Sequence, residues 1–315
     1  MKTPAITRAL FVLALTLFAA PPKGRATDLL LSAFGSDTIV RYDSTLGTFS
    51  TFATHPDMDG PAAMVYGPDG NLLVLCEFSH RVLRFNGTSG AFIDEFISSA
   101  TLGAAGVSDP DDMELGPDGN LFITGHFPET TDDFSAIFKF SGTSADTFLG
   151  DFATFGAIHH THGLAFGPGG KLFLGDVDTG QVHRFDGLAD PVPGTYLGPY
   201  VTTGGFIAYG DVAFTPDGTL YATYSGGVLR KVGPAGYTPF ITGDAYWGVL
   251  ADGGFLYLSD LTTGTLKKYT DTGGFVADIT GGPGAFDIIP MVPEPGTGGL
   301  LLAGLAGLGM RRARK

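Results

Sequence analysis

The 315-residue chain contains 49 glycines, 20 prolines and 26 phenylalanines, but only one cysteine and one tryptophan. The single cysteine excludes a disulfide framework and a zinc site built on cysteine ligands. The formal net charge of −14 argues against a general nucleic-acid-binding role, because phosphate neutralisation needs clustered Lys and Arg. Frequent Gly/Pro turns between runs rich in Phe, Val, Thr and Tyr are typical of an all-β protein.

The first 26 residues have the three parts of a secretory signal peptide. Basic residues precede an apolar run over residues 9–20, and small residues fit a cleavage site between Ala26 and Thr27. This run is short for a membrane span. The pattern therefore predicts a signal peptide over residues 1–26 and an exported protein. The alternative interpretation is an apolar N-terminal helix of the folded domain.

A turn of the form Gly-Pro-Asp-Gly recurs along the middle of the chain. Its intact and degraded copies are residues 67–70, 116–119, 167–170, 215–218 and 251–254. Each copy follows a short apolar run and precedes three further short strands. Pro at the second position and Gly at the fourth suit a tight β-turn. Four short strands in a repeat of about this length are the signature of a β-propeller blade.

The strand pattern also predicts how the propeller closes. Five complete units begin near residues 60, 110, 161, 210 and 246, and residues 28–54 supply three strands of a sixth. We expect residues 285–289 to supply the missing innermost strand, because joining the two ends in one blade removes exposed sheet edges. The sequence thus predicts a six-bladed β-propeller of four-stranded blades over residues 27–291.

The repeat resembles a known group of propellers. Residues 163–173 read GLAFGPGGKLF, and this phrasing resembles NHL-type repeats and the six-bladed propellers that include gluconolactonases. Those enzymes hold one divalent metal through a Glu before Gly-Pro, an Asn before Gly and an Asp before Gly. The matching positions here are Asp59, His162 and Asp211, so two of the three ligand types are substituted. The resemblance implies the fold more firmly than the activity.

Polar and aromatic residues are expected to gather on one face of the propeller. In this fold, the loops that lead into the innermost strands share a face with the loops that join second and third strands. Six of the seven histidines fall in such loops, and only His183 falls within a strand. The candidate ligand-face residues are His126, His159, His160, His162, Asp111, Asp112, Asp211, Tyr246 and Trp247.

The same face offers two kinds of metal site. The motif His-His-Thr-His-Gly over residues 159–163 suggests zinc, because neutral imidazoles are common zinc ligands. Alternation along a strand lets His160 and His162 converge while His159 diverges. The candidate metal ligands are His160, His162, Asp59 and Asp211. The alternative is a polar loop whose histidines bond to neighbouring backbone.

Acidic segments favour calcium instead. Residues 57–60, 109–112 and 176–180 place carboxylates two positions apart among turn residues, and hard oxygen ligands suit calcium. Asp is also an ordinary turn residue, so both interpretations stay open. The chain lacks a P-loop, a nucleophile elbow, a dinucleotide fingerprint and a His-Glu-x-x-His motif.

The C-terminal segment, residues 292–315, has three parts. Pro293, Glu294 and Pro295 precede a Gly/Leu-rich apolar run and then a basic end, RRARK. This order resembles the PEP-CTERM sorting signal of exopolysaccharide-producing Gram-negative bacteria. The resemblance implies secretion, transient anchoring in the inner membrane by a short transmembrane helix, cleavage by an exosortase, and release or attachment at the cell surface. The alternative is a permanent membrane anchor.

Removing both terminal segments changes the charge balance. Residues 27–292 contain 10 basic and 31 acidic residues, a net formal charge of −21. This charge disfavours nucleic acids and anionic membranes and favours divalent cations and neutral glycans. The sequence favours an exported binding or exopolysaccharide-matrix protein that takes a polysaccharide or small molecule. The alternative is a metal-dependent hydrolase, lactonase or lyase with a His/Asp site.

Overall fold

The computed structural model describes residues 27–126, 135–154, 161–202, 210–224, 226–231, 236–260 and 263–291. The expected signal peptide and the expected apolar helix of the C-terminal segment lie outside these residues. Within them, no helix is both long and apolar enough to cross a membrane. The described residues include all strands of the predicted propeller domain.

These residues form six four-stranded antiparallel sheets, numbered here as blades 1 to 6 and given from the axis outward. Blade 1 contains β24 (Ile288–Pro290), β1 (Leu29–Ala33), β2 (Thr38–Asp43) and β3 (Thr48–Thr54). Blade 2 contains β4 (Pro61–Tyr66), β5 (Leu72–Cys76), β6 (Arg81–Phe85) and β7 (Phe92–Ile97). Blade 3 contains β8 (Ser108–Leu115), β9 (Leu121–His126), β10 (Ser135–Phe140) and β11 (Phe148–Thr154).

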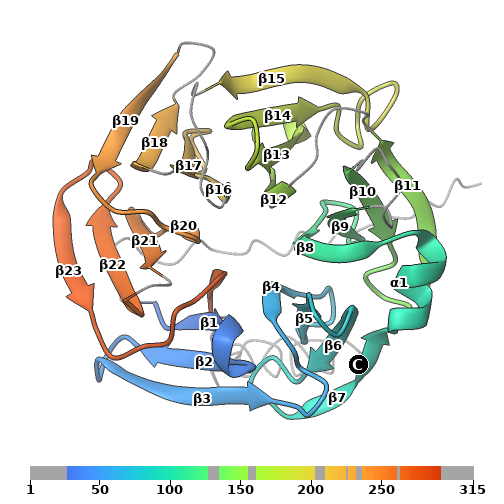
Figure 1. Cartoon of the computed structure of the whole chain (residues 1–315), viewed down its shortest axis with the longest axis horizontal. Helices are drawn as coiled ribbons and strands as arrows, with labels where there is room; N and C mark the ends of the chain where they lie inside the picture. The colour runs from blue at the N-terminus through green and yellow to red at the C-terminus, as the bar shows by residue number, and fades with distance from the viewer. Residues whose placement is uncertain are drawn as a thin grey trace, which may run out of the picture.

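The other three blades repeat this order. Blade 4 contains β12 (Thr161–Phe166), β13 (Leu172–Asp176), β14 (Gln181–Phe185) and β15 (Tyr196–Thr202). Blade 5 contains β16 (Val212–Phe214), β17 (Leu220–Tyr224), β18 (Gly227–Lys231) and β19 (Tyr237–Thr242). Blade 6 contains β20 (Val249–Asp252), β21 (Phe255–Asp260), β22 (Thr265–Thr270) and β23 (Phe275–Ile279). The blades surround a central axis, with one short helix, α1 (Ser99–Ala105), between blades 2 and 3 (Figure 1).

The two ends of the domain meet in blade 1, as the sequence predicts. The closing strand β24 pairs antiparallel with β1, with Leu29 opposite Pro290 and Leu31 opposite Ile288. The closing strand therefore begins three residues later than the expected residues 285–289. The N–H of Met291 donates to the carbonyl of Asp28 over 2.8 Å, so both ends leave the domain side by side.

The recurring turns lie where the innermost strands end. In blade 2, the N–H of Gly70 donates to the carbonyl of Gly67 over 2.9 Å, and Gly70 has a φ of 77°. A side chain would be strained at this φ, which explains the glycine. The carboxylate of Asp69 accepts from the N–H of Asn71. These turns define one face of the propeller, the turn face. The innermost strands begin on the opposite face, the pocket face.

The core lies between neighbouring blades. Leu75 and Phe96 of blade 2 pack with Ile123 and Phe138 of blade 3, and all four side chains are at most 1% exposed. Cys76 ends β5 with no exposed surface, and burial raises the pKa of its thiol to about 12. The cysteine is thus part of the packed interior.

Candidate functional site

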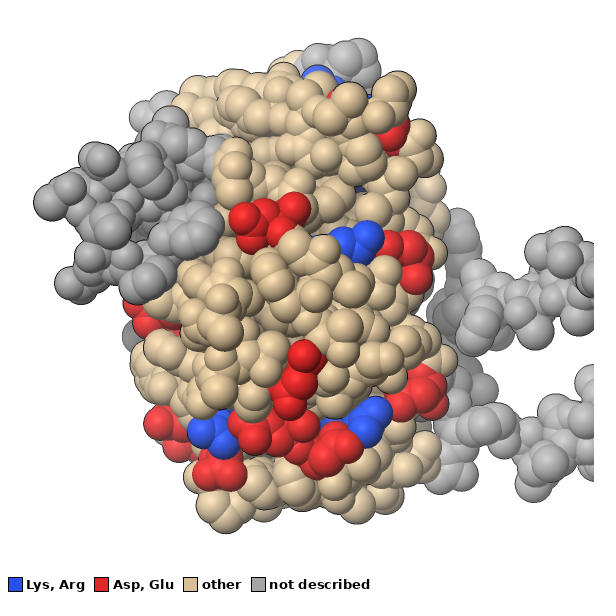
Figure 2. Space-filling model, turned by 90° about the vertical axis from the view of Figure 1, so that its right-hand side faces the viewer, with Lys and Arg blue, Asp and Glu red and all other residues tan. Residues whose placement is uncertain are grey.

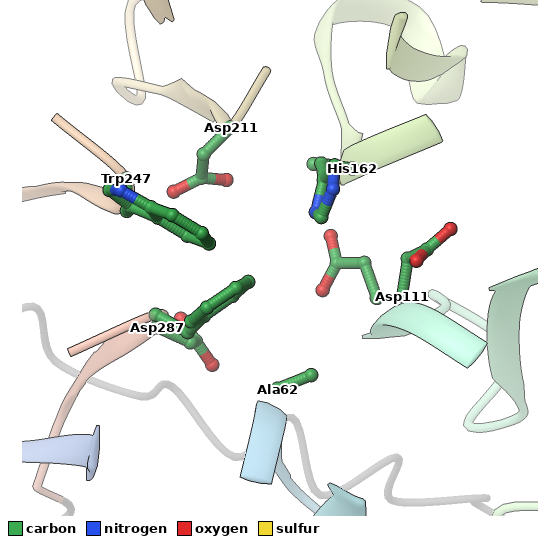
Figure 3. A pocket seen from close by; sticks show the side chains of 9 residues that line it. Ala62, Asp111, His162, Asp211, Trp247 and Asp287 are labelled. Atoms are coloured by element: carbon green, nitrogen blue, oxygen red, sulfur yellow. The ribbon is translucent and has the colours of Figure 1, made fainter. Parts of the chain in front are cut away.

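A small pocket with a volume of about 30 Å³, partly open to solvent, lies on the axis at the pocket face (Figure 3). All six blades contribute to its wall. The lining residues are Ala62, Asp111, Asp112, His162, Gly163, Asp211, Trp247, Phe286 and Asp287. Five of these nine belong to the residues that the sequence suggests for the ligand face: Asp111, Asp112, His162, Asp211 and Trp247.

The lining residues occupy two consecutive positions at the start of each innermost strand. The position nearer the pocket mouth, called the first ring, holds Phe286, Ala62, Asp111, His162, Gly210 and Trp247 in blades 1 to 6. The position that follows it, called the second ring, holds Asp287, Ala63, Asp112, Gly163, Asp211 and Gly248. Each blade therefore contributes one residue to each ring, and the residue type differs from blade to blade.

Irregular pairing turns part of the first ring toward the axis. The register between β4 and β5 shifts at Ala62, and the register between β8 and β9 shifts at Asp111. A similar shift in β12 includes His162. Such bulges leave a residue out of the ladder and redirect its side chain. In Figure 3, the side chains of His162, Asp211 and Trp247 project into the cavity from three successive blades.

The second ring alternates between aspartate and a small residue. Asp287, Asp112 and Asp211 stand in blades 1, 3 and 5, and each carboxylate accepts a hydrogen bond from the innermost strand of the next blade. The donors are the N–H groups of Met64 to Asp287 (2.7 Å), Leu164 to Asp112 (2.5 Å) and Val249 to Asp211 (2.6 Å). We call these three contacts the aspartate staples. They join the blades in three pairs.

The glycines of blades 4 and 6 allow the next blade to come close. A Cβ on Gly163 would lie 2.5 Å from the Cα of Asp211, and a Cβ on Gly248 would lie 2.7 Å from the carbonyl oxygen of Phe286. Neither distance is compatible with a side chain at these positions. The ring therefore closes through hydrogen bonds at three blade interfaces and, at these two, through close backbone contact.

The staples are also fixed within their own blades. The N–H of Asp112 donates to the hydroxyl of Thr124, and the N–H of Asp211 donates to that of Thr223, each over 3.0 Å. In blade 1, the N–H of Asp287 donates to Ser32 in the same way, over 2.8 Å. The carboxyl groups are thus held in position before any ligand arrives.

Withdrawal from water makes these carboxyl groups weak acids. It raises the pKa of Asp112 to about 6, and it raises the pKa of Asp287 to about 7 with help from the charge of Asp112. The pKa of Asp211 also lies well above its usual value for the same reasons. Glu114, two residues beyond Asp112 in β8, has a pKa raised to about 8 by burial and by the neighbouring carboxylates. Part of this set is therefore protonated near neutral pH.

Asp111 adds another weak acid at the pocket mouth. Asp111 is only 6% exposed. Burial, together with the charges of Glu77 and Asp109, raises the pKa of its carboxyl group well above the usual range. Burial also raises the pKa of Glu77 to about 7. A protonated carboxyl both donates and accepts hydrogen bonds, so this wall can bond to hydroxyl groups.

Several expected site residues lie elsewhere. Tyr246 is 1% exposed and packs in the core between blades 5 and 6, which corrects the expectation that it faces a ligand beside Trp247. Neighbouring residues in an extended chain point to opposite sides, so only Trp247 reaches the pocket. Asp59 is exposed and does not line the pocket. His126 ends β9, whereas His159 and His160 lie outside the described residues.

Of the four candidate metal ligands, His160 lies outside the described residues. No group of three or more His, Cys, Asp or Glu side chains among them is arranged to hold a metal ion. The oxygens of Asp211 accept hydrogen bonds from the N–H groups of Val212 and Val249, which gives this carboxylate a structural role. With Asp59 outside the pocket, His162 and Asp211 remain as a pair at the positions that the gluconolactonase resemblance indicates.

The third acidic segment proposed for calcium has an internal explanation. Asp176 has no exposed surface; its carboxylate accepts from the N–H of Asp178 and from the hydroxyl of Thr179, and it bonds to Nε2 of His183 over 3.1 Å. Burial by itself would raise the pKa of Asp176, but the hydrogen bonds to its carboxylate lower this pKa below its usual value. The carboxylate therefore stabilises its own turn and a buried histidine.

Sequence reasoning missed Phe286 and Asp287, which it assigned only to the closing strand. The signal was present, because Asp287 precedes an apolar strand in the same way as Asp112 and Asp211 do. Recognising it requires the alignment of blade 1 with blades 3 and 5, and the ends of blade 1 come from opposite ends of the chain.

Comparisons with known proteins agree with this architecture. Residues 292–315 match the family described as the PEP-CTERM protein-sorting motif. The sequence has no significant match among curated proteins. The fold resembles a chain of a nidogen/laminin complex, at 14% identity over 84% of this chain and 98% of that chain, with a TM-score of 0.66.

Two further solved structures share the fold. One is a candidate gluconolactonase, at 18% identity over 75% of this chain and 86% of that one, with a TM-score of 0.53. The other is virginiamycin B lyase from Staphylococcus aureus, at 16% identity over 74% and 75%, with a TM-score of 0.52. These identities show the fold alone. The sorting motif indicates export to the surface or exterior of a Gram-negative cell and processing by an exosortase-like enzyme. The chain is thus a six-bladed β-propeller that carries a PEP-CTERM protein-sorting motif at its C-terminus.

Proposed function

We propose that this protein is an exported binding protein whose axial pocket holds a neutral, hydroxyl-rich ligand of the glycan class. The observation that carries the proposal is the composition of the pocket wall. One indole, that of Trp247, projects into a cavity that is also lined by four carboxyl groups, one imidazole, the ring of Phe286 and two small residues. Ligand sites typically combine an aromatic surface with a few well-placed polar groups.

The chemistry of this wall matches a sugar. A sugar ring has an apolar face, which can lie against an indole, and hydroxyl groups at its edge, which need donors and acceptors. Carboxyl groups with raised pKa values, such as those of Asp111 and Asp211, can supply both. The staples hold Asp211 in place, so little ordering is needed when a ligand binds.

The charge of the domain argues for a neutral ligand. On the side shown in Figure 2, Asp and Glu clearly outnumber Lys and Arg. The net formal charge of −21 over residues 27–292 would repel polyanions before they reached the pocket. Uronic-acid polymers and phosphorylated ligands are therefore disfavoured.

The position of the chain ends supports a role at the cell surface. Asp28 and Met291 lie at the turn face, because β24 begins at the pocket and ends beside the start of β1. A chain held through its C-terminal segment would thus be held from the face opposite the pocket.

The test is a screen of the secreted protein against neutral and acidic glycans, followed by titration calorimetry. Trp247→Ala should weaken the binding of any retained glycan about tenfold or more, because truncating a central aromatic contact typically has an effect of this size. Phe275→Ala is the matched control, since Phe275 is 57% exposed on the outermost strand of blade 6. Absence of binding to every glycan, or equal binding by Trp247→Ala, would contradict the proposal.

A further inference from the structure

Trp247 is the first of four aromatic rings in continuous contact. Its indole meets the ring of Phe286 edge to face, with centroids 4.0 Å apart. Phe286 stacks on Phe34 at 4.2 Å, and Phe34 meets Phe78 edge to face at 5.1 Å. We call these four residues the aromatic track.

The track lies on the pocket face and crosses three blades. Trp247 and Phe286 precede the innermost strands of blades 6 and 1, where they line the pocket. Phe34 and Phe78 lie in the loops that join the second and third strands of blades 1 and 2. Loops of this kind share a face with the starts of the innermost strands. The track therefore leads from the pocket outward over the adjacent blades.

The outer end of the track is held by the backbone around Gly60. A Cβ at this position would lie 2.9 Å from Cδ2 of Phe78 and 3.1 Å from Cε2 of Phe34, so only glycine lets both rings pack there. Gly60 also has a φ of 63°, and its N–H donates to Asp37 over 3.0 Å. The N–H of Phe78 in turn donates to the carbonyl of Asp59. Both rings thus rest on a backbone fixed by hydrogen bonds.

The outermost ring of the track is its most exposed one. Trp247, Phe286 and Phe34 are partly exposed, and Phe78 is 59% exposed. A single exposed phenylalanine is ordinary, but a contiguous apolar strip that continues a pocket marks a ligand surface. Phe78 packs only against the track in the ring contacts of the described residues, so core packing does not account for its position.

We infer that the aromatic track continues the binding site, so that the ligand is an extended neutral polysaccharide rather than a single sugar. This inference rests on the proposed function and specifies its ligand. Successive sugar units lie along the solvent-facing side of this strip and contact Trp247 and Phe286 at the pocket and Phe34 and Phe78 farther out. The hydroxyl groups at the pocket end bond to the carboxyl wall. Exposed Asp37, in the same loop as Phe34, and exposed Asp59, whose carbonyl accepts from the N–H of Phe78, provide further acceptors.

The experiment measures how affinity depends on chain length. The secreted protein is first tested by affinity electrophoresis against soluble neutral polysaccharides (glucan, mannan and xylan) and against alginate as the acidic comparison. Calorimetry then follows the oligosaccharides of the retained polymer, from the disaccharide to the hexasaccharide. Wild type should bind the hexasaccharide at least about tenfold more tightly than the disaccharide, since each added ring contact contributes.

Two substitutions separate the two ends of the site. Phe78→Ala should weaken hexasaccharide binding about fivefold to tenfold and leave disaccharide binding unchanged. Trp247→Ala should weaken both. Phe78→Tyr should restore hexasaccharide affinity, and Phe275→Ala, the same change at an exposed ring far from the track, should have no effect. Because Phe78 is exposed, its truncation leaves the packed core intact.

The outcomes distinguish this inference from the proposed function. If disaccharide and hexasaccharide bind equally and Phe78→Ala matches wild type, while Trp247→Ala loses binding, the pocket binds a glycan but the track does not. If alginate is retained in preference to the neutral polymers, the assignment of a neutral chain is overturned. If no polymer is retained, the proposed function fails, and this inference fails with it.

Discussion

Replacing Asp287 tests whether the aspartate staples hold the ring of blades together. Asp287 precedes the closing strand, and its carboxylate accepts from the N–H of Met64 in blade 2 over 2.7 Å. Asp287→Ala leaves this N–H without its acceptor. Because Met64 is only 1% exposed, water cannot easily replace the carboxylate. An unsatisfied buried donor costs about 1–3 kcal/mol. At about pH 4, where Asp287 is protonated in the fold and carries no buried charge, a loss of about 2 kcal/mol in a domain of this size lowers Tm by roughly 4–8 °C.

The pH dependence of Asp287→Asn provides a second measurement. The pKa of Asp287 is raised in the fold from 3.8 to about 7, mainly by desolvation. The folded protein therefore holds this proton more tightly than the unfolded chain, and wild type loses stability as pH rises from about 4 to 7. The loss is at most about 4 kcal/mol, because solvent reaches the partly exposed carboxyl group. Asn mimics the protonated form and does not titrate.

Thermal unfolding followed by circular dichroism across this pH range would measure both effects. The Tm of Asp287→Asn relative to wild type should increase as pH rises from about 4 to about 7, where only the unfolded chain has lost this proton, and should level off above pH 7. Asp278→Asn is the control, since Asp278 is exposed on β23 and its ion pair with Lys267 at 3.2 Å is worth little. An unchanged Tm for Asp287→Ala, or an Asn-to-wild-type difference that is constant with pH, would refute the reasoning.

Three other predictions concern the core, the blade contacts and the C-terminus. Cys76, with no exposed surface and a pKa of about 12, should resist alkylation until the protein is unfolded; rapid labelling of the native protein would contradict its placement. Gly163→Ala should lower the urea midpoint by the equivalent of about 2 kcal/mol or more, because its Cβ would collide with Asp211, whereas Gly35→Ala, which meets only open space, should not. Mass spectrometry of the secreted protein should show removal of the C-terminal segment, and an intact Lys315 would contradict processing by an exosortase.

The fold could be predicted from the sequence because each blade is a local unit. The turn that contains Gly70 and the apolar runs on either side of it need no distant information, and their repetition specifies a ring. The closing strand could also be predicted, although the observed strand Ile288–Pro290 begins three residues after the expected start at residue 285. The shift arises because the residues before Ile288 turn inward to line the pocket.

The candidate site was only partly predictable. Strand order determines which loops share a face, and this placed Asp111, His162 and Trp247 in the right region. It could not determine which side of the chain each residue presents. Tyr246 therefore enters the core while its neighbour Trp247 enters the pocket.

The charge balance and the sorting motif are properties of the sequence by itself. The alternation of staples and small residues, which pairs Asp287 with Met64 and leaves Gly163 against Asp211, exists only once the blades surround the axis. The aromatic track has the same origin, since Phe34 and Phe78 come from one end of the domain and Trp247 and Phe286 from the other. A linear pattern records the residues of each blade in order. Only closure of the ring brings together side chains from its first and last blades.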